Sequence, residues 1–291
     1  MAEKPMNILI LMDDQHRHDA LSCAGHSMAQ TPNLDALVAE GTRFTQAVAN
    51  LPICVPCRHS FITGYYAHQL GILSNQHSWL DPVPVPTLGM RLQEAGYATA
   101  SVGKMHWKTA TTKRGFDFRA VRSVTESPDE PVDISYEDAV PEAMAAVRVP
   151  LIVRWPGLKS GQVLDTPVEL VDLMPTWLEA AGLDVPDTMP GQSLYPLLAG
   201  DTLEDWRTAT FAEMCTIPGE SRAQWILREN RYKLIERVSA RSALYDLESD
   251  PNEFDNRIDD PALFDVRDRL RTALLHRVMM ASETEAKHFI Q

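Results

Sequence analysis

The segment "CVPCRHSFITG", residues 54–64, contains two of the four cysteines of the chain, with an arginine directly after the second. A zinc site needs four ligands, usually from two such pairs, and the sequence has no second Cys-x-x-Cys pair. A thioredoxin-like redox pair needs a strand before it and a helix that begins at the first cysteine. A third interpretation makes Cys54 alone the functional residue and Cys57 a small filler. The sequence around the segment decides among these interpretations.

On both sides of this segment, patterns typical of strands and helices alternate. Continuous apolar runs such as "NILILM" predict buried parallel strands. The helical segments have apolar residues at helical spacing, and two of them begin at a threonine and end at a glycine. The predicted strands are 7–12, 97–103 and 149–157, and the predicted helices are 31–41, 87–96 and 168–182. This order predicts an α/β fold with a mostly parallel sheet flanked by helices.

The pattern changes after about residue 200. Short strands are predicted within 208–214, 224–230 and 231–238, with a hairpin turn at 229–230 and a closing amphipathic helix at 266–280. Residues 244–256 are rich in turn formers. We therefore predict a core at 1–200 and a smaller C-terminal α+β subdomain at 201–291, with a small antiparallel sheet and a terminal helix.

Composition narrows the class of partner. The chain has 27 Lys and Arg against 40 Asp and Glu, a net charge of −13, which argues against nucleic acid or an anionic membrane as the main partner. The apolar run near the start is too short for a signal peptide or a membrane span. Four scattered cysteines do not make a secreted disulfide scaffold. The expectation is a cytoplasmic protein with reduced thiols and a small-molecule substrate.

Asp13 and Asp14 directly follow the first predicted strand. Open α/β sheets bind ligands at the carboxyl ends of their strands, and two adjacent carboxylates repel each other unless a cation lies between them. A hard metal ion is therefore one interpretation, and a loop N-cap with a solvated neighbour is the other. Two carboxylates alone do not complete a calcium site of roughly six to eight oxygens.

Several motifs together resemble the sulfatase family. The pattern Cys-x-Pro-x-Arg, followed by Phe-Ile-Thr-Gly, is similar to the signature whose first cysteine is oxidised to formylglycine. "GYATASVGKMH", residues 96–106, resembles the second signature of the family. Further similar segments follow in the family's order, namely 7–26, 31–50, 147–157, 171–183 and 244–256. The resemblance implies an alkaline-phosphatase-like fold and a sulfuric ester hydrolase, with a phosphonate or phosphate monoester hydrolase of the same superfamily as the alternative.

The resemblance also assigns the reacting group and the metal site. Cys54 would be converted to formylglycine by a maturation enzyme, and the hydrated aldehyde is a diol that acts as the nucleophile. Asp13 and Asp14, together with the group formed from Cys54, would hold a divalent cation that activates the diol and polarises the sulfate ester. Ca²⁺ is the expected ion, with Mg²⁺ or Mn²⁺ as alternatives.

Three further residues receive roles by resemblance. Arg58, one helical turn after Cys54, would hold the diol and offset developing negative charge. Lys104 and His106 would contact the sulfate group, since two residues that lie two apart at a strand end point to one side. Without the motif, Arg58 would be a surface ion-pair partner, and Lys104 and His106 an exposed pair beside Trp107.

One difference from the family is an absence. Residues 114–119 lead through the acidic segment 120–147 almost directly to 147–157, where sulfatases carry a long middle section. That section contains the second pair of metal ligands and a further histidine and lysine. The segment Ser123–Val147 has no Lys or Arg and is predicted to be a linker or surface loop. A catalytically impaired remnant with a binding or assembly role is therefore an alternative, and an incomplete core favours homo-oligomers.

Overall fold

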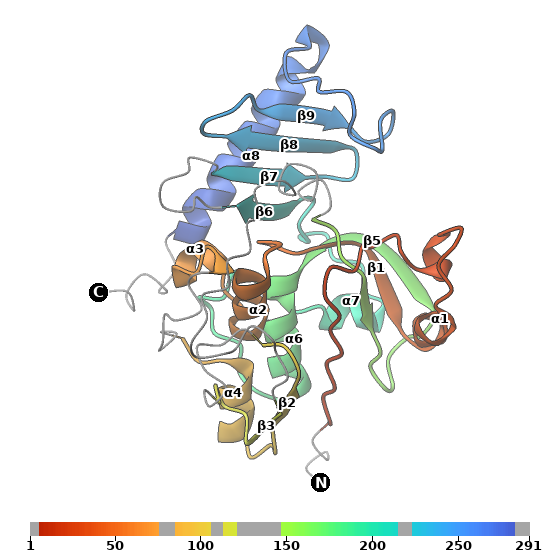
Figure 1. Ribbon diagram of the computed structural model, residues 1–291, viewed down its shortest axis with the longest axis vertical. Coiled ribbons are helices and arrows are strands. Elements are labelled where there is room, and N and C mark those ends of the chain that lie inside the picture. The colour runs from red at the N-terminus through yellow and green to blue at the C-terminus, as the bar shows by residue number, and fades with distance from the viewer. Residues whose placement is uncertain (1–5, 76–84, 106–112, 121–146, 215–222, 283–291) are drawn as a thin grey trace.

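The structure is a computed structural model that describes residues 6–75, 85–105, 113–120, 147–214 and 223–282. Figure 1 shows its helices and strands. The strands are β1 (Thr42–Val48), β2 (Ala100–Val102), β3 (Phe118–Ala120), β4 (Leu151–Val153), β5 (Gln162–Glu169), β6 (Thr210–Met214), β7 (Gln224–Arg228), β8 (Tyr232–Arg237) and β9 (Ala243–Asp246). The α-helices are α1 (Pro32–Glu40), α2 (Cys54–Thr63), α3 (Ala67–Leu70), α4 (Leu88–Glu94), α6 (Leu173–Ala180), α7 (Tyr195–Ala199) and α8 (Phe264–Ser282). None of them is long and apolar enough to cross a membrane.

The α/β fold class is confirmed, but the sheet of the core is mixed rather than mostly parallel. Strand β1 lies between β4 and β5, parallel to β5 and antiparallel to β4, while β2 and β3 form a separate parallel pair. The antiparallel pairing follows from where the chain enters the sheet. Val147 lies beside Ala49, just beyond the carboxyl end of β1, so the chain leads into β4 in the opposite direction. A parallel neighbour would need a crossover connection.

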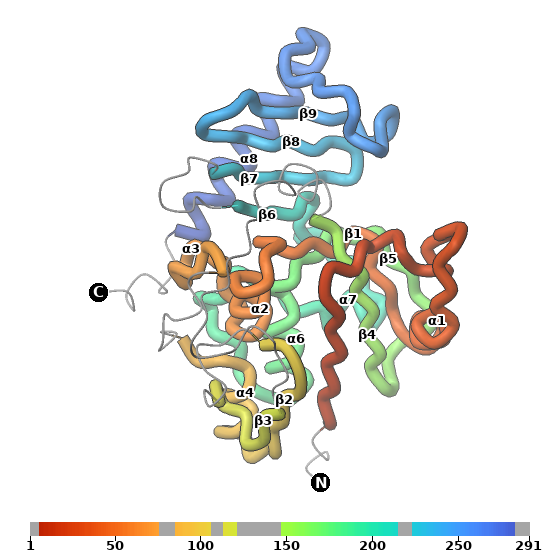
Figure 2. Tube along the Cα trace, in the orientation of Figure 1, coloured from red at the N-terminus to blue at the C-terminus, as the bar shows by residue number. Residues whose placement is uncertain are grey.

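The prediction of a buried parallel strand at 7–12 is wrong for this chain. Residues 6–12 form neither helix nor strand, and Leu9 and Leu11 are 81% and 82% exposed. Figure 2 shows this segment in dark red, as an irregular path leading away from the N-terminus. The physical reason is pairing, because none of the described strands is hydrogen-bonded to residues 6–12. An apolar run without a neighbouring strand has no ladder to join.

The predicted helices and the second predicted strand are present. Helix α1 begins after Thr31, and α4 begins after Thr87, whose hydroxyl accepts the backbone N–H of Met90. The Thr31 hydroxyl instead donates to Asp35 within α1. Strand β2 is shorter than the predicted 97–103. Residues 168–182 contain the end of β5, a 3₁₀ turn (Leu170–Asp172) and α6, so the predicted helix begins later than expected. The acidic segment 123–147 lies outside the described residues except for Val147, which is buried.

The C-terminal part forms its own antiparallel sheet, in the order β6-β7-β8-β9, with α8 packed against it (Figure 1). The predicted hairpin joins β7 to β8. Strand β9 was not predicted, because turn formers dominate 244–256. Leu270 and Leu274 of α8 pack with Leu227 and Leu234 of the sheet. The boundary between residues 200 and 201 stays a prediction.

Helix α2 lies in the centre of the core. Phe61 and Ile62 pack with Phe44 of β1 and Val168 of β5. Eight of the ten residues of α2 are buried, and the two that keep exposed surface are Cys54 and Cys57. The helix ends at Gly64, whose φ of +79° favours glycine and where an added Cβ would lie 3.0 Å from Met174. Packing therefore fixes α2 on every side except near its first turn.

Candidate active site

Cys54 is the first residue of α2. The backbone N–H groups in the first turn of a helix have no partner within the helix, and they favour an anion nearby. One of them, that of Val55, donates to the side-chain oxygen of Asn75 at 3.0 Å. Cys54 thus lies at the positive end of a buried helix, a place suited to a reaction that develops negative charge.

Lys104 and Asp14 come together beside Cys54. The Nζ of Lys104 lies 3.6 Å from the Sγ of Cys54 and forms an ion pair with Asp14. An oxygen of Asp14 lies 4.0 Å from the same sulfur. Partial burial on its own would lower the pKa of Lys104, but Asp14 and Cys54 outweigh it and raise that pKa above its usual value. Lys104 therefore remains a cation at neutral pH.

The side chain of Arg58, on α2, also lies at the site around Cys54 and Lys104. Its side chain is only 8% exposed, and its Nη1 donates to the backbone carbonyl of Lys104 at 2.6 Å. That bond joins α2 to the turn after β2, which carries Lys104. The described contact of Arg58 is thus with the backbone of Lys104, and in this structure Arg58 holds Lys104 in position over the first turn of α2.

Asp13 points to a different partner. Its carboxylate binds Nδ1 of His16, and Nε2 of His16 lies 3.1 Å from the carbonyl of Ala20. Burial would lower the pKa of His16, but the Ala20 carbonyl and Asp13 raise it above its usual value. The Asp13 side chain is 68% exposed. The structure therefore brings Asp14, Cys54, Arg58 and Lys104 together, while Asp13 faces His16.

The donor set for a metal ion is incomplete among the described residues. No group of three or more His, Cys, Asp or Glu side chains in this part of the chain is placed to hold an ion. Asp14 is paired with Lys104 and Asp13 with His16, so each carboxylate already has a competing partner. Two carboxylates leave most of the roughly six to eight positions around Ca²⁺ to other ligands. These residues alone do not fit a complete calcium site.

One predicted site residue lies outside the described part of the chain, and two residues near the site were not predicted from the sequence. His106 lies outside the described residues. Asn75 was not predicted, and no motif marks an asparagine that lies 20 residues after Val55, whose N–H it accepts. His16 was not among the predicted site residues, although its place three residues after Asp13 was a signal for the pair.

The two cysteines of the Cys-x-x-Cys segment differ in environment. The thiols of Cys54 and Cys57 are both free, so no disulfide joins them. Cys57 keeps some exposed surface but packs against the core beneath α2, and this burial raises its pKa to about 12. A thiol that hardly ionises is a poor nucleophile and a poor redox partner. The environment of Cys57 therefore favours its role as a filler.

Alkylation measures this difference. At pH 8 the pKa of about 12 leaves Cys57 a thiolate fraction on the order of 10⁻⁴. We expect iodoacetamide to label Cys54 of the unmodified chain at least ~10²-fold faster than Cys57. Peptide mass spectrometry over a time course measures both rates, with Cys57→Ser as the control that leaves Cys54 as the one cysteine of residues 44–58. Equal rates at the two cysteines would show that Cys57 is not held in the packed environment described here.

Two family models match consecutive parts of the chain. The sulfatase model, described as "Sulfatase", matches residues 5–145. The model described as "N-sulphoglucosamine sulphohydrolase, C-terminal" matches residues 142–279. The first covers Asp13, Asp14, Cys54, Arg58 and Lys104, and the second covers the C-terminal sheet and most of α8. The two matches overlap at residues 142–145 and together span residues 5–279.

Curated relatives show the same similarity over part of the chain. N-acetylglucosamine-6-O-sulfatase of Bacteroides thetaiotaomicron is 36% identical over 121 residues, 41% of this chain and 21% of that protein. Human arylsulfatase D is 37% identical over 123 residues, 39% of this chain and 21% of the relative. The chain thus matches about a fifth of the length of each of these curated relatives.

Solved structures show the same fold at lower identity. A structure of BT4656 in complex with its substrate D-glucosamine-2-N,6-O-disulfate superimposes with a TM-score of 0.79 at 18% identity, over 96% of this chain and 99% of that one. The phosphonate monoester hydrolase of Agrobacterium radiobacter gives a TM-score of 0.76 at 18% identity, over 92% and 94% of the two chains. Family models, relatives and fold agree, and the chain belongs to the sulfatase family of the alkaline-phosphatase-like superfamily.

Proposed function

We propose that this chain hydrolyses a sulfuric ester with a formylglycine formed from Cys54. The observation that carries the proposal is the meeting of Lys104, Asp14 and Arg58 around Cys54 at the start of α2. Formylglycine, as a hydrated diol, supplies the nucleophilic hydroxyl. Cys54 lies partly exposed at the start of a buried helix, so the maturation enzyme and the substrate approach the same open end of α2.

The residues around Cys54 suit an anionic substrate. Lys104 is about one third exposed, so its ammonium can contact an incoming sulfate group while it remains beside Cys54. The positive end of the dipole of α2 favours the same negative charge. Arg58 holds the backbone of Lys104, which keeps the ammonium close to its position before and during the reaction. We also propose His106 as a second contact to the sulfate.

We propose that Asp13 and Asp14 bind a divalent cation, Ca²⁺ in the first place, but only weakly in this chain. Each carboxylate would have to leave its present partner, and water would fill most of the remaining positions. Calorimetric titration with Ca²⁺, Mg²⁺ and Mn²⁺ should give dissociation constants weaker than ~1 μM. Asp14→Asn is the matched control and should remove the residual heat. Tighter binding accompanied by sulfatase turnover would show that other residues complete the site.

The names of similar proteins support a proposal for the class of substrate. One relative is named as an N-acetylglucosamine-6-O-sulfatase, and one similar structure contains a disulfated glucosamine. We therefore propose a small sulfate ester, with sulfated amino sugars as the first class to test. The exposed apolar side chains of Leu9 and Leu11 support the further proposal of a homo-oligomer.

The experiment that tests the function is turnover by chain co-expressed with a formylglycine-generating enzyme. We expect slow hydrolysis of an aryl sulfate, and slower or no hydrolysis of the matching aryl phosphonate ester. Phosphonate hydrolysis without sulfate hydrolysis would assign the other activity of the superfamily. Complete conversion of Cys54 without turnover of any ester would show that the chain is an inactive remnant.

A further inference from the structure

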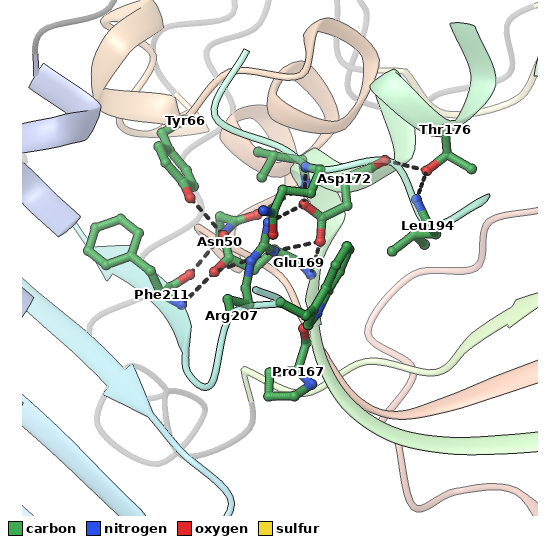
Figure 3. Close-up of polar contacts among 12 residues, drawn as sticks. Asn50, Tyr66, Pro167, Glu169, Asp172, Thr176, Leu194, Arg207 and Phe211 are labelled. Carbon is green, nitrogen blue, oxygen red and sulfur yellow. Dashed lines mark hydrogen bonds and ion pairs between the residues drawn. The ribbon is translucent and has the colours of Figure 1, made fainter. Parts of the chain in front are cut away.

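Glu169 is the last residue of β5, and its side chain is completely buried. One of its carboxylate oxygens accepts hydrogen bonds from the side-chain amide of Asn50 at 2.9 Å and from the hydroxyl of Tyr66 at 2.8 Å. The other oxygen accepts from the backbone N–H of Phe211 at 2.9 Å and from Arg277 at 2.8 Å. Figure 3 shows Asn50, Tyr66 and Phe211 around this carboxylate.

Two of these partners flank α2. Asn50 lies four residues before Cys54, and Tyr66 lies two residues after Gly64, which ends the helix. One carboxylate oxygen therefore joins the segment that enters α2 to the segment that leaves it. Asn50 is held further by bonds to the carbonyl of Phe211 at 2.8 Å and the N–H of Val171 at 3.3 Å.

These four partners are donors, and so is the backbone N–H of Asp172, which also bonds to the Glu169 side chain, so the site requires an acceptor on both oxygens. Burial on its own would raise the pKa of Glu169, but Arg277 and Arg207, with the bonds from Tyr66 and Phe211, hold it below its usual value. Burial raises the pKa of Tyr66 well above its usual value, so its hydroxyl keeps its proton and remains a donor. A glutamine amide in this place would turn an NH₂ group toward two donors.

We propose that Glu169 is a positioning residue for Cys54, because it fixes both ends of α2 and ties them to the C-terminal subdomain. The tie runs through Phe211 of β6 and Arg277 of α8. The C-terminal subdomain would thereby help to hold the catalytic helix in place, even though the described contacts of Cys54 are with Asp14 and Lys104. The link to catalysis rests on the proposed function, whereas the positioning of α2 does not.

The test uses the full chain without maturation, so that Cys54 and Cys57 are both thiols. In Glu169→Gln, the backbone amides of α2 should exchange hydrogen roughly tenfold faster or more, and iodoacetamide should label Cys57 faster by a similar factor. Amides of α1 serve as the internal reference, because α1 packs against β1 and β4 and takes no part in the described hydrogen bonds of Glu169, Asn50 and Tyr66. Tyr66→Phe removes the bond that its hydroxyl donates to Glu169 and the bond that it accepts from Arg277, both on one flank of α2, and should give a smaller change in the same direction.

Asp246→Asn is the matched control. Asp246 of β9 is a largely buried carboxylate that binds Arg231 through both oxygens, at 3.1 and 2.9 Å, and in the described part of the chain it makes no hydrogen bond to Glu169 or to residues 50–66. It should change global stability without a selective effect on α2. If the α2 amides and Cys57 respond no more in the Glu169 and Tyr66 variants than in Asp246→Asn, the proposal is wrong. If Glu169→Gln does not fold, the exchange of the α2 amides and the labelling of Cys57 in Tyr66→Phe are compared with the control in the same way.

A second measurement separates positioning from proposed function. In matured protein, Tyr66→Phe should lower kcat for an aryl sulfate and leave KM nearly unchanged, because a shift of the nucleophile affects the reacting geometry more than binding. A rise in KM alone would contradict the positioning role. If the parent chain shows no turnover, the function fails, and the exchange and alkylation results still decide whether Glu169 holds α2.

Discussion

Replacement of Cys54 by alanine is expected to abolish sulfate-ester hydrolysis by the matured chain, with a loss in kcat on the order of 10⁶-fold. The reason is that alanine offers no atom from which the formylglycine can be made. Cys57→Ser should keep much of the activity, since Cys57 packs against the core and its thiol hardly ionises. Steady-state rates with an aryl sulfate, measured on purified matured protein, give both values.

The two cysteine variants need a folding control, because α2 is central to the core. Circular dichroism and the unfolding midpoint should match those of the parent chain for Cys54→Ala, since this side chain is partly exposed. Equal loss of activity in Cys54→Ala and Cys57→Ser, with both proteins folded, would contradict the formylglycine assignment. It would instead favour a role for the two thiols as a pair.

Arg207→Met is expected to lower the free energy of unfolding by about 3–5 kcal/mol. Arg207 is only 7% exposed and forms a bidentate ion pair with Asp172, whose carboxylate has no exposed surface (Figure 3). It also lies 3.8 Å from Glu169. Methionine fills a similar volume but leaves the Asp172 charge buried without its cation, and this desolvated charge causes the loss. Urea unfolding monitored by tryptophan fluorescence measures it.

Arg154→Met is the matched control for this prediction. Arg154 pairs with Glu40 at 2.8 Å on the surface, where both side chains are about half exposed or more. Exposed pairs contribute roughly 0–1 kcal/mol because water and salt screen them. Similar losses in the two variants would mean that burial does not set the importance of the Arg207 pair.

Local sequence signals predicted much of the fold. The starts of α1 and α4 follow from the threonine before each helix, with Pro32 also at the first position of α1, and the β7–β8 hairpin follows from two strand patterns around residues 229–230. Strand β9 was not predicted because its local sequence is rich in turn formers. It forms because tertiary contacts pair it with β8.

The error at residues 7–12 has a different cause. The apolar run is a strand pattern in composition, but a strand exists only where a neighbour has free backbone groups. In the described part of this chain no neighbouring strand pairs with the run, so it stays outside the described sheets. Sequence can show that a segment suits a strand without showing whether its neighbour is available.

The site was predicted in part. The motif resemblance brought Asp14, Cys54, Arg58 and Lys104 into one site, and the structure places them together. It could not show that Arg58 binds the backbone of Lys104, because that contact depends on how α2 packs. The roles of Glu169 and Asp172 were also missed. Two carboxylates inside the apolar run 168–178 were a signal for a buried network, since charges are rarely buried unless paired.

The most direct test of the central claim is the mass of the peptide that contains Cys54. Trypsin should release residues 44–58, which carry both Cys54 and Cys57, and fragmentation locates any change. After co-expression with a formylglycine-generating enzyme, we predict that Cys54 carries the mass of an aldehyde in place of a thiol, while Cys57 remains a thiol. A Cys54 that stays entirely a thiol, in cells where a reference sulfatase is fully converted, would contradict the assignment of Cys54 as the precursor of the nucleophile.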